Sequence, residues 1–460
     1  MQAKELPRPA GVVWDDKTTC IYDVQFYPYD APGEDPVFAA TGFQRVYVCR
    51  LSKDKSDQIE TLREFNDQSK ENGKSTELNS VAWTQDMENG NPLLCVAGAQ
   101  PPIIKILDIL EDKHTRDLVG HGGYINDLKI SPTCPEILAS ISEDERIYIW
   151  HLGAKYQKIP IAAMFHGAAK GHCLAFHDSG RYVISGWYDS SIQLWALPDL
   201  PNENTGTDNV KPTYVPHFTS NEIHANEVDS IAFYGDMVIS KAALEDSIFI
   251  WRIEGFKGSL PPPQCTSTAD YKDCFFREDE DADGFHGSTY SAFGPRFQRL
   301  ISLKTGHHSN IWLRFGLFHM PQKRPVLAYG ANDGVIYLWD LQRLEEECRD
   351  GDANRERSPS QQSSMFGSPG GRSMSVASNG SVRPREKPSM KTKSQPYQDP
   401  FTPVPAHKSL HLPNKIRQDR VMTTRATAWS SGGEWVVSVG EGNSDRAGKK
   451  GFICLMNRWL

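Results

Sequence analysis

The chain has 460 residues and a mass of 51.6 kDa, and its 50 Lys and Arg residues against 58 Asp and Glu residues give a net charge of −8. A mean hydropathy of −0.51, without any run of about 18 apolar residues, excludes a membrane-embedded protein. The acidic balance argues against a protein whose whole surface binds nucleic acid. The first residues lack the apolar segment of a signal peptide, so we do not expect secretion.

Cysteine usage and the common catalytic motifs bear on redox compartment and chemistry. The nine cysteines are scattered and odd in number, and no two form a CxxC pair, which is typical of reduced thiols in the cytosol or nucleus. The sequence contains no P-loop, GxGxxG, GxSxG or HExxH motif. We therefore expect a protein that is not an enzyme and binds neither metal nor cofactor.

Short apolar or alternating runs recur along the chain in sets of three. Each run is rich in β-branched and aromatic residues and is bounded by turn-forming residues, as strands are. The sets cover residues 21–51, 79–109, 120–152, 172–197, 228–253, 311–341 and 425–459. With a fourth strand drawn from each connecting segment, seven sets predict an all-β fold of seven repeated sheets.

In four of these sets an acidic residue stands six positions before a tryptophan. The pairs are Asp144–Trp150, Asp189–Trp195, Glu245–Trp251 and Asp333–Trp339. A histidine, His121 or His224, precedes two of the sets. The combination resembles WD40 repeats, in which a His, a Ser or Thr, an Asp and the Trp indole form a buried polar network that holds one blade together. The resemblance implies a seven-bladed WD40 β-propeller with long disordered loop insertions, and structural rather than catalytic roles for these residues.

We expect a single propeller over residues 12–460, closed by pairing of residues 12–14 with the last blade, because closure removes exposed sheet edges. The 256–292 insert contains a proline run and an acidic run at 277–283, which fits either a solvated loop or an acidic docking patch. The 344–408 insert, before the last blade, is rich in Ser, Pro and basic residues and is predicted to be disordered.

The longer insert carries two further sequence signals. Ser358 and Ser368 each precede a proline, as sites of proline-directed kinases do. Basic residues between 383 and 393 fit a nuclear import signal or a weak nucleic-acid contact, and a solubilising linker fits them equally well.

Segments outside the repeat pattern resemble the embryonic ectoderm development protein family, the WD-repeat subunits of the Polycomb repressive histone methyltransferase complex. These segments are 21–46, 79–106, 120–142, 217–241, 310–315 and 334–341. The chain is identified as a divergent, fungal-type member. The resemblance implies a nuclear, non-catalytic scaffold that binds the SET-domain catalytic subunit, other Polycomb subunits and the histone H3 tail, with no small-molecule substrate and no membrane.

The resemblance also implies a methyl-lysine site built from an aromatic cage, in which a quaternary ammonium lies over π-faces. The first cage aromatic corresponds to Tyr22, the second position is Asn79, which has no π-face, and Trp312 supplies the third; the fourth has no counterpart. Asn126 and Arg425 correspond to residues that contact the peptide. Core packing is the competing interpretation for Tyr22 and Trp312, and an ordinary strand polar residue for Asn126 and Arg425.

Two other kinds of function remain open. A WD40 substrate receptor of a ubiquitin ligase would need a ring of arginines for phosphopeptides, and Arg425 is a single arginine; another WD40 interaction scaffold is the broader version of this alternative. A propeller hydrolase lacks a candidate nucleophile or metal set. Co-purification would separate the Polycomb-type scaffold from the ubiquitin-ligase receptor. A SET-domain subunit would support the scaffold, and a cullin adaptor would support the receptor.

Overall fold

The computed structural model describes most of the chain. The described residues are 6–15, 17–31, 33–52, 58–68, 70–71, 74–264, 289–294, 296–306, 311–332, 334–347, 399–412, 422–444 and 448–458. Most of both expected inserts, with Ser358, Ser368 and the basic residues, therefore lies outside the described residues, as does Asp333. The chain divides into one unit of Met1–Leu341 with Pro400–Leu460 and a second of Gln342–Asp399, in which residues 342–347 are helical.

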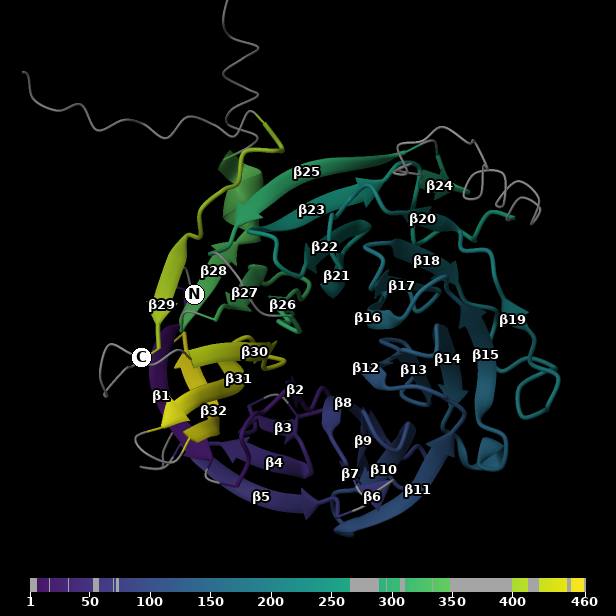
Figure 1. Ribbon diagram of the computed structural model, residues 1–460, viewed down its shortest axis with the longest axis horizontal. Coiled ribbons are helices and arrows are strands. Elements are labelled where there is room, and N and C mark those ends of the chain that lie inside the picture. Colours follow the sequence, from purple (N-terminus) through teal and green to yellow (C-terminus); the bar gives the residue numbers. More distant parts are fainter. Residues whose placement is uncertain are drawn as a thin grey trace, which may run out of the picture. The chain divides into compact units, whose positions relative to one another are not determined.

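The first unit consists of seven sheets of four or five strands arranged around a central axis (Figure 1). The first blade contains β2 (Asp23–Phe26), β3 (Val37–Gly42), β4 (Arg45–Leu51) and β5 (Ile59–Asn66). The second contains β8 (Leu78–Gln85), β9 (Pro92–Gly98), β10 (Ile103–Asp108) and β11 (Lys113–Val119). The third contains β12 (Ile125–Ile130), β13 (Ile137–Ser142), β14 (Arg146–His151), β15 (Ile161–His166) and β19 (Pro212–Thr213). A hairpin of β6 (Lys70–Glu71) and β7 (Lys74–Ser75) and a 3-10 turn (Ala154–Tyr156) lie in the connections.

The remaining four blades follow in chain order. The fourth contains β16 (Gly171–Phe176), β17 (Tyr182–Trp187), β18 (Ile192–Ala196), β20 (Phe218–Ser220) and β24 (Thr289–Ser291), and the fifth contains β21 (Val228–Tyr234), β22 (Met237–Ala242), β23 (Ser247–Ile253) and β25 (Phe297–Lys304). The sixth contains β26 (Gly316–Phe318), β27 (Val326–Gly330), β28 (Val335–Asp340) and β29 (Lys408–His411). The seventh contains β30 (Met422–Trp429), β31 (Trp435–Ser444), β32 (Gly448–Asn457) and β1 (Arg8–Asp15). The predicted seven-bladed propeller is confirmed.

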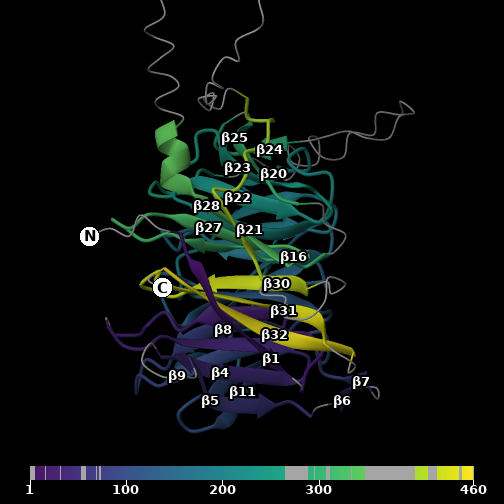
Figure 2. The same cartoon turned by 90° about the vertical axis from the view of Figure 1, so that its left-hand side faces the viewer.

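The ring closes through the two ends of the described chain. β1 pairs antiparallel with β32, and the register sets Val12 opposite Cys454 and Trp14 opposite Phe452. In Figures 1 and 2 the purple β1 lies along the yellow β32. The expected closing strand at residues 12–14 is therefore confirmed.

One strand prediction was wrong in its bounds. The first run of the sixth set, residues 311–316, was expected to be the inner strand of that blade, but β26 starts at Gly316. Trp312 has a φ of 63°, in the left-handed region that strands do not use. The 311–315 segment is therefore a loop that leads into the blade, and β29, at the end of the longer insert, supplies the blade's outer strand.

The third blade contains the complete polar network expected of a WD40 repeat. His121 Nε2 lies 2.7 Å from Ser140 Oγ, and its Nδ1 lies 3.0 Å from Asp144 Oδ2. Trp150, fully buried, donates its indole N–H to Ser140 Oγ at 2.8 Å. The fifth blade repeats this arrangement with Glu245 in place of the aspartate.

The fourth blade has an equivalent polar network that contains no histidine. Gly167 occupies the position five residues before the bulge of the inner strand, where the third and fifth blades have their histidine. The Trp187 indole occupies the space, because a Cβ on Gly167 would lie 2.2 Å from its ring. Trp187 and Trp195 both donate to Ser185 Oγ, at 3.0 and 3.1 Å. A tryptophan thus replaces the histidine in the network.

Apolar side chains fill the spaces between neighbouring sheets. One cluster joins Val24 and Phe38 of the first blade to Trp435 and Val437 of the seventh, which secures the closure from the inside. No helix in the described part of the chain is long and apolar enough to cross a membrane.

Candidate functional site

Five of the seven innermost strands have a β-bulge where the chain enters them. The bulged residues are Asn79 in β8, Asn126 in β12, His172 in β16, Asp229 in β21 and Arg425 in β30. A bulge leaves one residue outside the ladder and re-aims its side chain. In the other two blades, Tyr22 directly precedes β2, and Arg314 stands two residues before β26. The blades thus present a ring of seven side chains at one mouth of the channel.

Most of this ring encloses a small cavity of about 20 Å³. Its lining consists of Tyr22, Asn79, Asn126, His172, Trp312 and Arg314. Four of the five predicted site residues are therefore brought together from the first, second, third and sixth blades. His172 and Arg314 were missed by sequence reasoning. A cavity of this size has room for about one water molecule, so a methylammonium group would require side-chain movement.

The fifth predicted residue, Arg425, does not line this cavity. Its Nη1 donates to the Ile311 carbonyl at 2.7 Å, and its Nη2 lies 2.6 Å from Glu441 Oε1. Burial disfavours its charge, but Cys20 and Glu441 outweigh burial and raise the pKa of Arg425. Arg425 thus ties the seventh blade to the 311–315 loop that carries Trp312.

Trp312 and Tyr22 are the two expected aromatics; a residue of the fifth blade holds Trp312, and a residue of its own blade packs on Tyr22. The Trp312 backbone N–H donates to Asp229 Oδ1 at 3.0 Å, which fixes the left-handed conformation of the loop. The Tyr22 ring lies 5.5 Å from that of Phe43, centroid to centroid. Burial raises the pKa of the Tyr22 phenol, so the ring stays neutral at physiological pH.

His172 contributes a ring from the fourth blade. Its centroid lies 6.2 Å from that of Trp312, edge to face at 77°, and 5.0 Å from that of Tyr188. Burial, and then the charge of Arg314, lowers the pKa of His172 to about 3. The imidazole is therefore neutral at physiological pH.

Asn126 joins two blades as well as lining the cavity. Its Nδ2 donates to the Gly171 carbonyl at 2.8 Å, and its own backbone carbonyl accepts from Arg314 Nη2. The side chain is nearly fully buried. Its amide is therefore partly committed to holding the third blade against the fourth.

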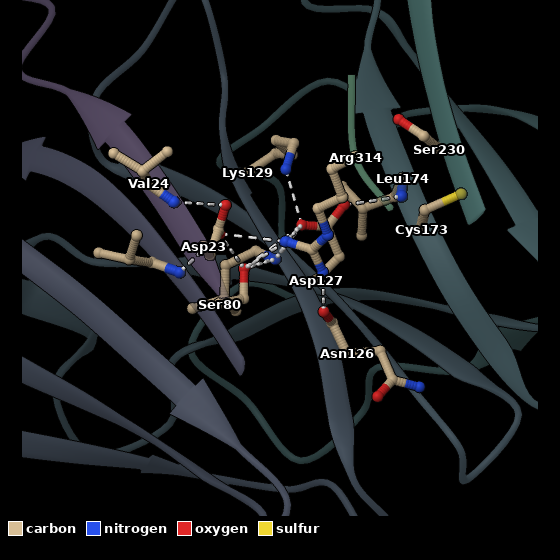
Figure 3. Close-up of polar contacts among 12 residues, drawn as sticks. Asp23, Val24, Ser80, Asn126, Asp127, Lys129, Cys173, Leu174, Ser230 and Arg314 are labelled. Atoms are coloured by element: carbon tan, nitrogen blue, oxygen red, sulfur yellow. Dashed lines mark hydrogen bonds and ion pairs between the residues drawn. The ribbon is translucent and has the colours of Figure 1, made fainter. Parts of the chain in front are cut away.

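Arg314, which lines the cavity, is the centre of an ion cluster (Figure 3). Arg314 Nη1 lies 3.0 Å from Asp23 Oδ2 and 3.2 Å from Asp127 Oδ1. Ser80 Oγ donates to Asp23 at 3.1 Å, and Lys129 Nζ lies 2.6 Å from Asp127. Burial would raise the pKa of Asp127, but Arg314 and Lys129 outweigh it and lower that pKa. In this cluster the positive charges of Arg314 and Lys129 balance the negative charges of Asp23 and Asp127.

Beyond Arg314, a cavity of about 460 Å³ follows the inner strands toward their far ends, where Ile130 and Trp429 line it. Across the described ranges, no three His, Cys, Asp or Glu side chains gather as metal ligands would. The groups present at the mouth are π-faces, neutral hydrogen-bonding groups and a guanidinium paired with carboxylates.

Comparison with known proteins agrees with this architecture. The family profile "WD domain, G-beta repeat" matches residues 112–151 and 164–196. The Polycomb protein EED of Chaetomium thermophilum is 38% identical over 341 residues, which are 71% of this chain, and the chain spans 58% of that relative's length. The Polycomb protein esc of Drosophila melanogaster is 26% identical over 351 residues, covering 71% of each chain.

Solved structures extend the similarity to the whole chain. A humanized mutant of the Chaetomium thermophilum Polycomb Repressive Complex 2, bound to the inhibitor GSK343, contains a chain that is 31% identical, with 99% of each chain covered and a TM-score of 0.78. The chain belongs to the EED/Esc family of Polycomb WD40 proteins. A second similar structure is that of ctPRC2 in complex with H3K27me3 and H3K27M, at 29% identity, a TM-score of 0.75, and coverage of 100% of this chain and 99% of that one.

The channel mouth of this chain combines aromatic and polar side chains. Two of the seven ring positions carry asparagines, Asn79 and Asn126, and the loop before β26 has Trp312 followed by Leu313. The site therefore retains Tyr22 and Trp312 as its expected π-faces.

Proposed function

We propose that the chain is a non-catalytic scaffold subunit of a Polycomb-type histone H3 lysine methyltransferase complex. In this role it binds the SET-domain catalytic subunit and other Polycomb subunits, acts in the nucleus, and reads methyl-lysine on the H3 tail through a reduced aromatic cage. Membership of the EED/Esc family supports the assignment. So does the likeness to a chain of the solved complex with H3K27me3.

The observation that carries the peptide-binding part is the cavity at the channel mouth. It gathers Tyr22, Asn79, Asn126 and Trp312 from four blades, although they are far apart in the sequence. We assign Tyr22 and Trp312 to the methylammonium group and Asn79 and Asn126 to polar contacts with the peptide. Arg425 supports the Trp312 loop from the side and is the fifth residue of the proposed site.

The proposed site is a weak reader. Each π-face over a quaternary ammonium contributes roughly 0.5–2 kcal/mol. Loss of two such faces relative to a four-ring cage would remove about 1–3 kcal/mol, or up to about a hundredfold in affinity. We therefore expect the isolated chain to bind the peptide weakly and transiently. Stable binding would then depend on contacts that the rest of the complex adds.

A fluorescence-polarisation titration of the purified chain with H3 tail peptides, trimethylated and unmodified, tests this proposal. We expect the trimethylated peptide to bind more tightly, and Trp312→Ala to abolish that difference. Leu110→Ala, at an exposed position away from the mouth, is the matched control. Equal binding of both peptides by the parent chain would contradict methyl-lysine reading and leave only the scaffold role.

The scaffold role has its own test. Affinity purification of the tagged chain from nuclear extract should retain a SET-domain methyltransferase. Recovery of a cullin adaptor instead would favour the ubiquitin-ligase alternative. The arginine lining the cavity, Arg314, is already paired with Asp23 and Asp127, so it offers little to a phosphopeptide.

A further inference from the structure

The entrance positions of the seven inner strands are equivalent, and His172 occupies one of them. It is the bulged residue of β16, as Asn79 is of β8 and Asn126 is of β12. All three side chains line the same cavity. An aromatic ring at this position in any of these blades is therefore directed to the channel mouth, whichever blade carries it.

Ring contacts join His172 to the expected cage. Its edge-to-face contact with Trp312 has a centroid distance of 6.2 Å, which falls within the range of interacting aromatic pairs. Tyr188, in the turn between β17 and β18, packs on the imidazole at 5.0 Å and an angle of 32°. His172 is only 2% exposed, so its ring is held by these neighbours.

The imidazole is also uncharged, as a binding site for a cation requires. A protonated histidine would repel a methylammonium, whereas a neutral one offers a π-face. Burial keeps the pKa of His172 far below physiological pH, and the nearest described carboxylate, Asp229, has one oxygen 3.7 Å from Nδ1. Burial raises the pKa of Asp229 to about 7, so this neighbour is itself partly neutral.

We propose that His172 is the third wall of the methylammonium site and replaces, from the fourth blade, a π-face that the second blade lacks at Asn79. The inference rests on the proposed function, because it assigns a further residue to the same peptide-binding site. A cage in this chain would then consist of Tyr22, Trp312 and His172, drawn from three blades that are not consecutive.

The test compares two substitutions at His172 in the full chain, using the same trimethylated and unmodified H3 peptides. His172→Asn removes the π-face but leaves a residue that the equivalent bulges of the second and third blades already accommodate. His172→Phe keeps a π-face. We expect the preference for the trimethylated peptide to fall by roughly threefold to thirtyfold in His172→Asn and to be retained in His172→Phe. Thermal melting of each variant reports whether the fourth blade remains folded.

Controls separate the possible failures. Tyr22→Ala should lose the preference, and Tyr124→Ala, half-exposed in the loop before β12 and outside the cavity, should keep it. If Tyr22→Ala loses the preference while His172→Asn keeps it, His172 is not a wall and the inference is wrong although the proposed function stands. Equal losses in His172→Asn and His172→Phe, with unchanged melting, would also overturn a π-face role. A parent chain with no preference at all overturns both proposals together.

Discussion

Arg314 Nη1 lies 3.0 Å from Asp23 Oδ2, and this ion pair connects the sixth blade with the first across the mouth of the channel. The same guanidinium nitrogen lies 3.2 Å from Asp127 Oδ1 in the third blade. One side chain thus links the sixth blade to the first and the third, and no two of these blades are consecutive in the sequence. Burial opposes the charge of Arg314, but Asp127 and Asp23 outweigh burial and raise its pKa above the usual value.

Removal of that cation should be costly. Arg314→Met leaves Asp23 and Asp127 buried beside one another with less compensation, and we expect a loss of about 3–5 kcal/mol in the free energy of unfolding. Urea denaturation measures it. Combining Arg314→Met with Asp23→Asn and Asp127→Asn removes the uncompensated charges and should recover part of the loss. An unchanged midpoint in the single variant would mean that the cluster contributes nothing to closure.

The tryptophan of the third blade should matter for both packing and polarity. Trp150→Ala removes a fully buried ring and the donor to Ser140, for an expected loss of about 3–5 kcal/mol. Trp150→Phe keeps most of the volume and loses the donor, so its cost should be nearer about 1–3 kcal/mol. Denaturant unfolding of the two variants side by side tests this order. Similar values for both would place the whole effect on the hydrogen bond.

The glycine that faces Trp187 should not tolerate a side chain. A Cβ on Gly167 would lie 2.2 Å from the indole, so Gly167→Ala must displace a fully buried ring, at about 1–3 kcal/mol or more. Gly11→Ala is the control, because a Cβ added there would meet nothing within 4 Å. Thermal melting distinguishes them, and equal melting temperatures would show that Trp187 can move freely.

The buried histidine at the mouth should make the protein sensitive to acid. The folded state holds the pKa of His172 at about 3, against about 6.5 in the unfolded chain. Between these values the unfolded chain binds more protons, so stability is complete above pH 6.5 and declines as the pH falls toward 3. From pH 6.5 to 5 the parent should lose about 1.6 kcal/mol more than His172→Asn.

Urea denaturation across that pH range provides the measurement. His114→Asn is the matched substitution at an exposed histidine, whose side chain is 47% accessible. It should follow the parent. Parallel curves for the parent and His172→Asn would show that the imidazole is not desolvated in the folded state.

Local spacing explains which parts of the fold were predictable. The His121, Asp144 and Trp150 network of the third blade lies within one repeat, so the sequence spacing alone indicates it. The fourth blade's variant was not predicted, because a glycine at position 167 says nothing until the Trp187 ring is seen in its place. The inner strand of the sixth blade was misplaced because Trp312 takes its conformation from a hydrogen bond to Asp229, which is remote in sequence.

The site was predictable to a similar extent. Tyr22, Asn79, Asn126 and Trp312 came from the family resemblance, and the structure brings them together. His172 was missed because it matches no cage residue in that resemblance. A signal was nevertheless present: His172 stands five residues after Gly167, as Asn126 stands five after His121, so alignment of the repeats by their polar network marks it as equivalent.

The pairing of β1 with β32 has a consequence for how the protein folds during synthesis. The register that joins Arg8 to Asn457 pairs the first described strand with the last, so β1 is synthesised early but cannot pair until β32 has left the ribosome. Until then β1 has no partner, and the edge it presents is open to other chains. The entropic cost of bringing such distant segments together rises only with the logarithm of their separation. Closure is therefore delayed rather than disfavoured, and the nascent ring is most vulnerable to aggregation just before its last strand emerges.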